Sequence, residues 1–399
     1  MGKFKDMIKG DRLIWGVMVC LGVIGVVEVY SSTAALALAK QNGNTFYYAI
    51  KHFAFLLASF FTMFVFSLIP YKHYVKHANW LLGLGVLLLI CTFFSSNTTN
   101  DAKRWLTIPI IGLTFQPSDF VKLVLMLYLS KMLALAQVEP EKRRQCFLYS
   151  LGAIFGVCLL VLPSNFSTAA LIGAASFIVL ILGQFPRKWR WGVVGAAIVA
   201  FAMFMLFAKV AGIHTRIDTW VSRIETFVSG GDEKGSDFQA EQARVCIGLG
   251  GLKGVGIGHG VQGNSVPYPY SDFIFASIAH EGGIIGVVLV LALYMMLFYR
   301  CVAIVKDAKT LFPALLVMGL VSNIMLQAFA NIVVAIGLFP VTGQPLPFVS
   351  LGGSSMLCTS IALGVILNIS RYSGTRETVE EIEKDVPEEE IVDYPFMAG

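Results

Sequence analysis

The stretch "FIFASIAHEGGIIGVVLVLALYMMLFY", residues 273–299, decides the class of fold. It exceeds the roughly 20 residues that a helix needs to cross a bilayer, and its only acidic or basic side chains are His280 and Glu281. Ionisable groups inside such a stretch usually face a cavity or another helix rather than lipid. The stretch therefore predicts a transmembrane helix with two polar groups placed inside the membrane.

Similar apolar stretches recur along the whole chain. Of its 399 residues, 56% are hydrophobic and 14% are charged, whereas a soluble domain is about a quarter charged. These proportions predict an all-α polytopic integral membrane protein, and no basic, aromatic-rich surface suggests nucleic acid as a partner. The ten expected spans cover residues 13–33, 50–70, 79–96, 117–137, 146–163, 167–184, 191–211, 273–299, 311–336 and 350–370. The short link between the fifth and sixth spans, "LPSNFS", predicts a tight hairpin or a partly re-entrant pair.

Basic residues in the short loops set the orientation, because cytoplasmic loops carry an excess of lysine and arginine. With a cytoplasmic N-terminus, the inside segments before the tail hold 16 basic residues and the short outer loops hold 4. Both termini are therefore expected in the cytoplasm. Residues 1–374 then form one ten-span membrane domain, with a large outer loop at 212–272 between the seventh and eighth spans. Residues 375–399 carry nine acidic side chains without apolar periodicity, which predicts a disordered cytoplasmic tail.

The motif "QPSDFVK", residues 116–122, opens the fourth span. Pro117 suits the first turn of a helix, and an acid in that turn favours a helix N-terminus. Asp119 and Lys122 are three residues apart and share one helical face. Two interpretations stay open: a structural pair that caps and packs the helix, or ionisable groups that face a polar cavity inside the membrane.

Two further polar groups fall on the same outer face. Lys103 and Arg104 precede Trp105, and anchoring at the membrane interface would explain them taken alone. Asp272 stands directly before the eighth span, where an acid can cap the helix. Neither explanation accounts for the gathering of all three groups on one face. The Pro- and Gly-rich segment 339–355 breaks regular helix at membrane depth, which is tolerated against protein or a water-filled cavity.

An outer cavity that holds these cations and a carboxylate would suit an anionic lipid headgroup. Guanidinium and ammonium groups bind pyrophosphate through charge-assisted hydrogen bonds. A carboxylate can accept a proton from an attacking sugar hydroxyl, and cations stabilise charge on a departing phosphate. This chemistry fits glycosyl transfer from a lipid pyrophosphate and transport of such a lipid equally well. The seven cysteines form no CxxC pair, so neither disulfides nor a metal site is expected; a divalent cation as cofactor stays open.

At these motifs the chain resembles the SEDS family (shape, elongation, division and sporulation), the FtsW/RodA membrane proteins. The matching segments are "AKRWL" 102–106, "QPSDFVKL" 116–123, "NFSTAALI" 165–172, "GLGGLKGVGIGHG" 248–260, "YSDFIFASIAHEGGIIG" 270–286 and "LFPVTGQPLPFVSLGGSS" 338–355. The resemblance extends over the whole ten-span region. The glycine run among these segments is interpreted as a close-packed turn rather than as a backbone cradle for an anion.

The resemblance implies a peptidoglycan glycosyltransferase that polymerises lipid II at the outer face of the bacterial cytoplasmic membrane. It implies that Asp272 is the catalytic carboxylate. The other motif residues expected to bind substrate are Lys103, Arg104, Gln116, Asp119, Lys122, Glu281 and Ser354. The implied partners are lipid II, a class B penicillin-binding transpeptidase, other membrane proteins of the division machinery, and membrane lipids. A division-type FtsW role is favoured over an elongation-type RodA role; a lipid II transporter (flippase) and a non-catalytic scaffold are the alternatives.

The chain departs from the family pattern at four positions. Asp119 stands where glutamate is usual, Ser271 replaces a common threonine, and Leu351 replaces a frequent tyrosine. His280 occupies the place of the first of two acids, so the resemblance gives it no role. Glu281, the second acid, remains a match.

Overall fold

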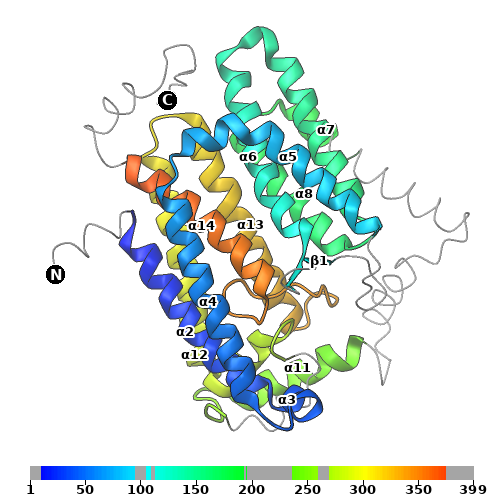
Figure 1. The fold of residues 1–399 in the computed structure, drawn as a ribbon, viewed down its shortest axis with the longest axis vertical. Helices are drawn as coiled ribbons and strands as arrows, with labels where there is room; N and C mark the ends of the chain where they lie inside the picture. The colour runs from blue at the N-terminus through cyan, green and yellow to red at the C-terminus, as the bar shows by residue number, and fades with distance from the viewer. Residues whose placement is uncertain are drawn as a thin grey trace, which may run out of the picture.

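The computed structural model describes residues 10–94, 105–108, 113–192, 195, 236–258 and 269–373. Its long helices lie side by side as a bundle (Figure 1). They are α2 (Arg12–Ser32), α4 (Thr45–Leu68), α5 (Tyr71–Phe93), α6 (Pro117–Val138), α7 (Arg143–Val161), α8 (Phe166–Leu182), α12 (Ile274–Lys306), α13 (Leu311–Ala335) and α14 (Gly353–Ser373). The shorter elements are α3 (Ala34–Lys40), β1 (Leu106–Ile108), β2 (Leu113–Phe115), η1 (Pro140–Lys142) and α11 (Ser236–Gly250).

These helices confirm a multi-pass membrane protein. Within the described ranges, eight helical segments are long and apolar enough to cross a membrane, and α8 adds a shorter apolar helix of 17 residues. Together they coincide with nine of the ten expected spans. The seventh expected span, 191–211, lies almost entirely outside the described residues, as does the tail 375–399. The link between α7 and α8 is short and the two helices pack against each other, as a tight hairpin would.

Three helices form the centre of the bundle. Most residues of α6, α13 and α14 are buried, and α13 packs against α6, α8, α12 and α14. The surrounding helices expose large hydrophobic side chains such as Phe61, Trp80 and Tyr299. A helix that is apolar on all sides suits a membrane environment. Polar residues on the three central helices are therefore kept from lipid and meet one another.

The long helix α12 is broken at Gly283, where φ is 61° and ψ is −159°. The break leaves two backbone carbonyls and two N–H groups without their helical partners. The glycine-rich segment 250–256 supplies new partners. The hydrogen bonds run from Ile284 N to Gly251 O (3.0 Å), from Ile285 N to Leu252 O (3.4 Å), from Val255 N to His280 O (3.0 Å) and from Gly256 N to Glu281 O (3.1 Å). The loop thus takes the place of one helical turn.

This exchange requires glycine, because the backbones approach closely. A Cβ atom on Gly250 would lie 2.0 Å from Ala279 O, and one on Gly254 would lie 2.0 Å from Glu281 O. No side chain fits at either distance. The interpretation of the glycine run as a close-packed turn is confirmed for the described part, residues 248–258.

Replacing Gly254 by alanine should destabilise the protein more than the same change at Gly258. Both residues have positive φ, +77° and +79°, but a Cβ on Gly258 would meet nothing within 4 Å. Alanine is therefore strained by its backbone conformation at both positions. In Gly254→Ala, the overlap of Cβ with Glu281 O adds about 1–3 kcal/mol to the loss of stability. Thermal unfolding of both variants in detergent measures the difference. Equal melting temperatures would show that the loop does not pack against α12.

Two elements of the structure were not expected. A short antiparallel hairpin pairs Leu106 with Phe115 and Ile108 with Leu113, in a described fold that is otherwise helical, as expected. Alternating threonine and large apolar residues favour such a strand pair. The predicted loop 212–272 also contains the helix α11, in which Ala243 and Cys246 are buried. These positions are three apart, the spacing of a helical face.

Candidate functional site

The first turn of α6 carries a buried ion pair. Gln116 is the N-cap residue, and Pro117 occupies the first helical position, where a missing N–H has no cost. Lys122 Nζ donates to Asp119 Oδ1 at 2.9 Å. Both residues are buried, 8% and 7% exposed. The expected i, i+3 pair is confirmed. Because both charges are buried, the pair is favourable only if further hydrogen bonds satisfy its remaining polar atoms.

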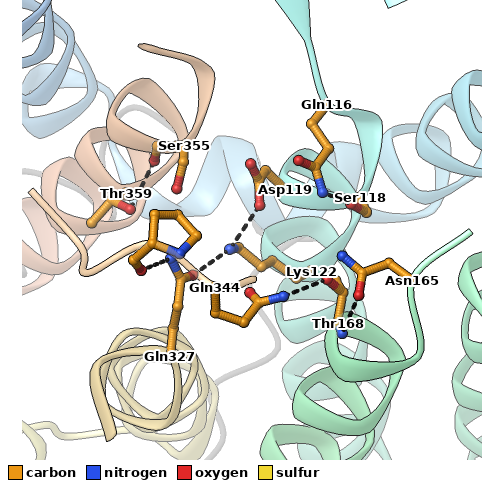
Figure 2. Close-up of polar contacts among 11 residues, drawn as sticks. Gln116, Ser118, Asp119, Lys122, Asn165, Thr168, Gln327, Gln344, Ser355 and Thr359 are labelled. Atoms are coloured by element: carbon orange, nitrogen blue, oxygen red, sulfur yellow. Dashed lines mark hydrogen bonds and ion pairs between the residues drawn. The ribbon is translucent and has the colours of Figure 1, made fainter. Parts of the chain in front are cut away.

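The pair continues into a polar network that crosses to α13 (Figure 2). Lys122 Nζ also donates to Gln327 Oε1 at 2.8 Å, and Gln327 Nε2 donates to Pro345 O at 2.9 Å. Next to that proline, Gln344 Nε2 donates to Thr168 Oγ1 of α8 at 3.0 Å. The network therefore ties α6, α8 and α13 to the irregular segment between α13 and α14.

Asp272 lies beside the same irregular segment, close to Gly343 and Gln344. Asn331 of α13 donates from Nδ2 to Asp272 O and to Gln344 O, each at 2.8 Å. A Cβ on Gly343 would lie 3.6 Å from Asp272 Oδ2. The N-cap residue of α12 is Phe273, whose side chain makes no capping hydrogen bond. Asp272 therefore stands one position before the N-cap residue.

The segment from Phe339 to Gly352 is irregular and largely buried, as its prolines and glycines predict. Phe348 has a φ of 67° and is 1% exposed. Ser350 Oγ donates to Ser271 O at 2.7 Å, and Leu351 N donates to Tyr270 O at 3.0 Å. Side chains and backbone of this segment thus hold the Asp272 turn in place.

Asn331→Ala should lower the free energy of unfolding by about 1–3 kcal/mol, because two buried carbonyl groups lose their donor. The matched control is Asn323→Ala on the same helix, where Nδ2 donates only to Gly319 O one turn earlier. We expect a smaller loss for that variant. Chemical unfolding in mixed micelles measures both values. A loss at Asn323 as large as that at Asn331 would show that the two hydrogen bonds of Asn331 do not hold the Asp272 turn in place.

Of the other predicted site residues, some lie near the Asp119–Lys122 ion pair and others do not. Gln116 Nε2 donates to Ser118 Oγ at 2.8 Å beside the ion pair. Ser354 is buried in the first turn of α14, which packs against α6. Glu281 accepts hydrogen bonds from Ser31 Oγ of α2 and, at 3.3 Å, from Gly258 N, so it joins a different set of contacts. Lys103 and Arg104 lie outside the described residues.

His280, which the sequence left without a role, connects two helices. Its side chain is buried, and its Nδ1 lies 3.0 Å from Cys246 O of α11. Because a carbonyl oxygen only accepts, the histidine donates there. His280 therefore fixes α11 against the first half of α12.

Sequence reasoning missed the residues that connect the site. Gln327 and Asn331 lie four apart on α13, in the otherwise apolar stretch from Ile324 to Ala335. Polar residues at that spacing share a helical face. This was a signal that the face of α13 meets other polar groups, although it did not indicate which ones.

Comparison with known proteins assigns the chain to a family. The family model described as "Cell cycle protein", for FtsW, RodA and SpoVE, matches residues 11–375. The chain belongs to the SEDS family. Relatives of this SEDS protein include stage V sporulation protein E of Bacillus subtilis, 30% identical over 91% of this chain and 97% of the relative. Another is the probable peptidoglycan glycosyltransferase FtsW of Coxiella burnetii, 31% identical over 92% and 98%.

Solved structures share the SEDS fold. A chain from a peptidoglycan synthase complex, studied for the coordination of polymerization and crosslinking, has a TM-score of 0.73 and 23% identity, with 92% of this chain and 99% of that chain covered. The rod shape determining protein RodA of Thermus thermophilus has a TM-score of 0.64 and 23% identity, with 92% and 98% covered. At this level of identity the similarity establishes the shared fold.

Proposed function

We propose that this SEDS protein is a peptidoglycan glycosyltransferase that polymerises lipid II. Its membership of the family and the names of relatives such as the Coxiella burnetii FtsW support this reaction. Residues 1–374 form the catalytic membrane domain in this proposal, and the site opens to the outer face of the bacterial cytoplasmic membrane. Polyprenyl pyrophosphate is the leaving group.

A single observation carries the proposal: one polar network joins a buried ion pair to the turn that holds Asp272. Lys122 reaches the segment 339–350 through Gln327, and Asn331 connects that segment with Asp272. A merely structural pair would need no such link. Fixed donors and acceptors around one carboxylate are what a transfer reaction with developing charge requires.

In the proposed reaction, Asp272 accepts the proton of the acceptor sugar hydroxyl. That oxygen forms a bond to the anomeric carbon of the donor, and the bond from this carbon to the pyrophosphate oxygen breaks. The proton remains on the Asp272 carboxyl until it passes to water. The negative charge leaves with the pyrophosphate, so cations are needed beside the leaving group.

Lys122 can supply part of the positive charge beside the leaving group. Its ammonium group has three N–H donors, and Asp119 and Gln327 take two of them. The third N–H is the one that we assign to substrate. Lys103 and Arg104 would supply the remaining positive charge, and Gln116, Ser354 and Glu281 would shape or support the site.

The biological setting is also part of the proposal. We infer a division-type role with a class B penicillin-binding transpeptidase as partner, because FtsW is the name of several relatives at about 30% identity. Expression of the chain in rod-shaped cells depleted of their own division or elongation protein distinguishes the roles. Rescue of elongation alone would contradict the division role.

The reaction is tested with purified protein, its transpeptidase partner and lipid II in detergent, where glycan strands should form. Transport of lipid II is the second candidate, favoured by the broken helix α12 and by ionisable groups inside the bundle. Vesicles that contain the protein measure it directly. Movement of lipid II without polymer formation would favour the transporter, and polymer formation without movement would exclude it.

A further inference from the structure

A group of basic side chains covers the start of α5, at the end of the bundle that is predicted to face the cytoplasm. Lys72 and His73 are followed four residues later by Lys76 and His77, and this spacing places all four on one side of the helix. His73, Lys76 and His77 are exposed, and Lys72 is half-buried. The helix contains no acidic residue over its whole length. Its first two turns therefore present positive charge to the surroundings of the bundle.

The neighbouring helix α6 extends this charge. Lys131 Nζ donates to Asn79 Oδ1 at 3.3 Å, and Asn79 follows Lys76 by three residues and Lys72 by seven, the spacing of one helical face. We call Lys131 and the four side chains of α5 the α5–α6 basic surface. Four acidic residues of the described chain lie at this end of the bundle, none of them in α5 or α6: Asp11, Glu139, Glu141 and Asp307.

The position of these cations on α5 is unfavourable without an anionic partner. The N-cap residue is Pro70, which makes no side-chain hydrogen bond, and no acid stands in the first turn. Lys72 and His73 lie in that turn, where the helix dipole disfavours positive side chains and favours anions. The surface therefore fits a partner that carries several negative charges.

The last turns of α14 are fixed beside this surface, as Figure 1 shows. Tyr71 N, at the first position of α5, donates to Asn368 Oδ1 at 3.0 Å. The rings of Tyr71 and Tyr372 lie 5.9 Å apart in an edge-to-face arrangement, and Arg371 Nη1 donates to Ser67 O at 2.8 Å. Residues 374–399 therefore leave the bundle next to the first turn of α5.

That tail has the complementary charge. It carries nine acidic side chains between Glu377 and Asp393, against the basic Arg376 and Lys384. Glu377 and Glu381 are four and eight residues beyond the end of α14, which an extended chain covers in about 13–29 Å. The helix rises only about 8 Å from Lys72 to His77. The first acidic residues of the tail can thus reach the whole surface.

We propose that the acidic tail docks on the α5–α6 basic surface of its own chain, with its first glutamates paired to Lys72 and Lys76. The tether decides between this occupant and the anionic lipid headgroups that the same charges could bind. A segment attached beside its site has an effective concentration in the millimolar range, and it needs no particular lipid. The docking does not depend on the proposed polymerisation, so each can fail without the other.

Cross-linking of the full-length protein in an uncharged detergent tests the contact directly. A carbodiimide joins a lysine amine to a carboxyl group in contact with it, with loss of water, and mass spectrometry of the digested protein identifies the pair. We expect Lys72 or Lys76 to be joined to tail glutamates of the same molecule. Lys306 and Lys309 are the control, because they are exposed at the same end of the bundle but lie on and after α12. Links from these two lysines alone would overturn the proposal.

Proteolysis of the tail measures how much of it is docked. A glutamate-specific protease should cut at residues 388–390 about three- to tenfold faster in Lys72→Glu/Lys76→Glu than in wild type, because cleavage follows the released population. Lys306→Glu/Lys309→Glu changes the net charge equally and should leave the rate unchanged. Equal rates for wild type and Lys72→Glu/Lys76→Glu would refute the docking.

A charge exchange separates docking from damage to the fold. Glu377→Lys, Glu380→Lys and Glu381→Lys, added to Lys72→Glu/Lys76→Glu, should restore slow cleavage at residues 388–390, because the two signs are then reversed together. In wild type, 1 M salt should release the tail, since it shortens the Debye length to about 3 Å. Failure of the exchanged charges to restore protection, in a variant that melts like wild type, would contradict direct pairing.

Bilayers of defined composition distinguish the tail from lipid headgroups. Wild-type protein in uncharged phosphatidylcholine should show the same protected tail as in detergent. If protection of the tail appears only after phosphatidylglycerol is added, the surface binds anionic headgroups and the direct contact with the tail is wrong.

Discussion

Asp272→Asn is expected to reduce lipid II polymerisation by about 10²–10⁴-fold, the usual contribution of a general base, while the fold is kept. The reason for the intact fold is that the structure holds this residue by its backbone: Asn331 donates to Asp272 O, and Ser350 donates to the adjacent Ser271 O. Asparagine has the same shape but cannot take up the proton of the acceptor hydroxyl. Polymer formation by purified protein with its partner measures the effect.

The matched control is Asp307→Asn at the opposite end of α12, where the side chain is exposed. That variant should polymerise lipid II like wild type. Melting temperatures of both variants show whether the fold is retained. Full activity of Asp272→Asn with an unchanged fold would remove Asp272 from the role of base and leave the family assignment intact.

The sequence predicted the helices of the bundle well, because span length and hydropathy are local properties. Nine expected spans coincide with helices, and the pair Asp119–Lys122 lies where its spacing places it. The break at Gly283 was not predicted. Two glycines in a long apolar stretch do not reveal that a loop some 30 residues earlier supplies the missing hydrogen bonds.

The connections within the site depend on contacts between distant segments. Gln327 and Asn331 look like isolated polar residues in α13, and only the fold brings them to Lys122 and Asp272. Glu281 matched a family motif but turns towards α2. Local spacing can predict which residues share a helical face, whereas the partner on the next helix is decided by packing.

Lys122→Met should lower the free energy of unfolding by about 3–5 kcal/mol, because it leaves the Asp119 carboxylate buried without its cation. The methionine side chain is of similar length, so loss of packing contributes little. Gln327 also loses the donor to its Oε1. Unfolding in mixed micelles measures the loss. Asp119→Asn added to Lys122→Met should restore part of the stability, since the uncompensated charge is then removed.

The chain offers a control with the same geometry. Lys142 and Glu139 form an i, i+3 ion pair at 2.7 Å, but their side chains are 60% and 35% exposed. Water already solvates that pair, so Lys142→Met should cost about 1 kcal/mol or less. The contrast isolates burial as the cause, because sequence spacing and residue type are nearly the same. If both lysine variants lose equally little, the pair at the start of α6 is solvated in the working protein, and Lys122 is then free to turn fully towards the pyrophosphate.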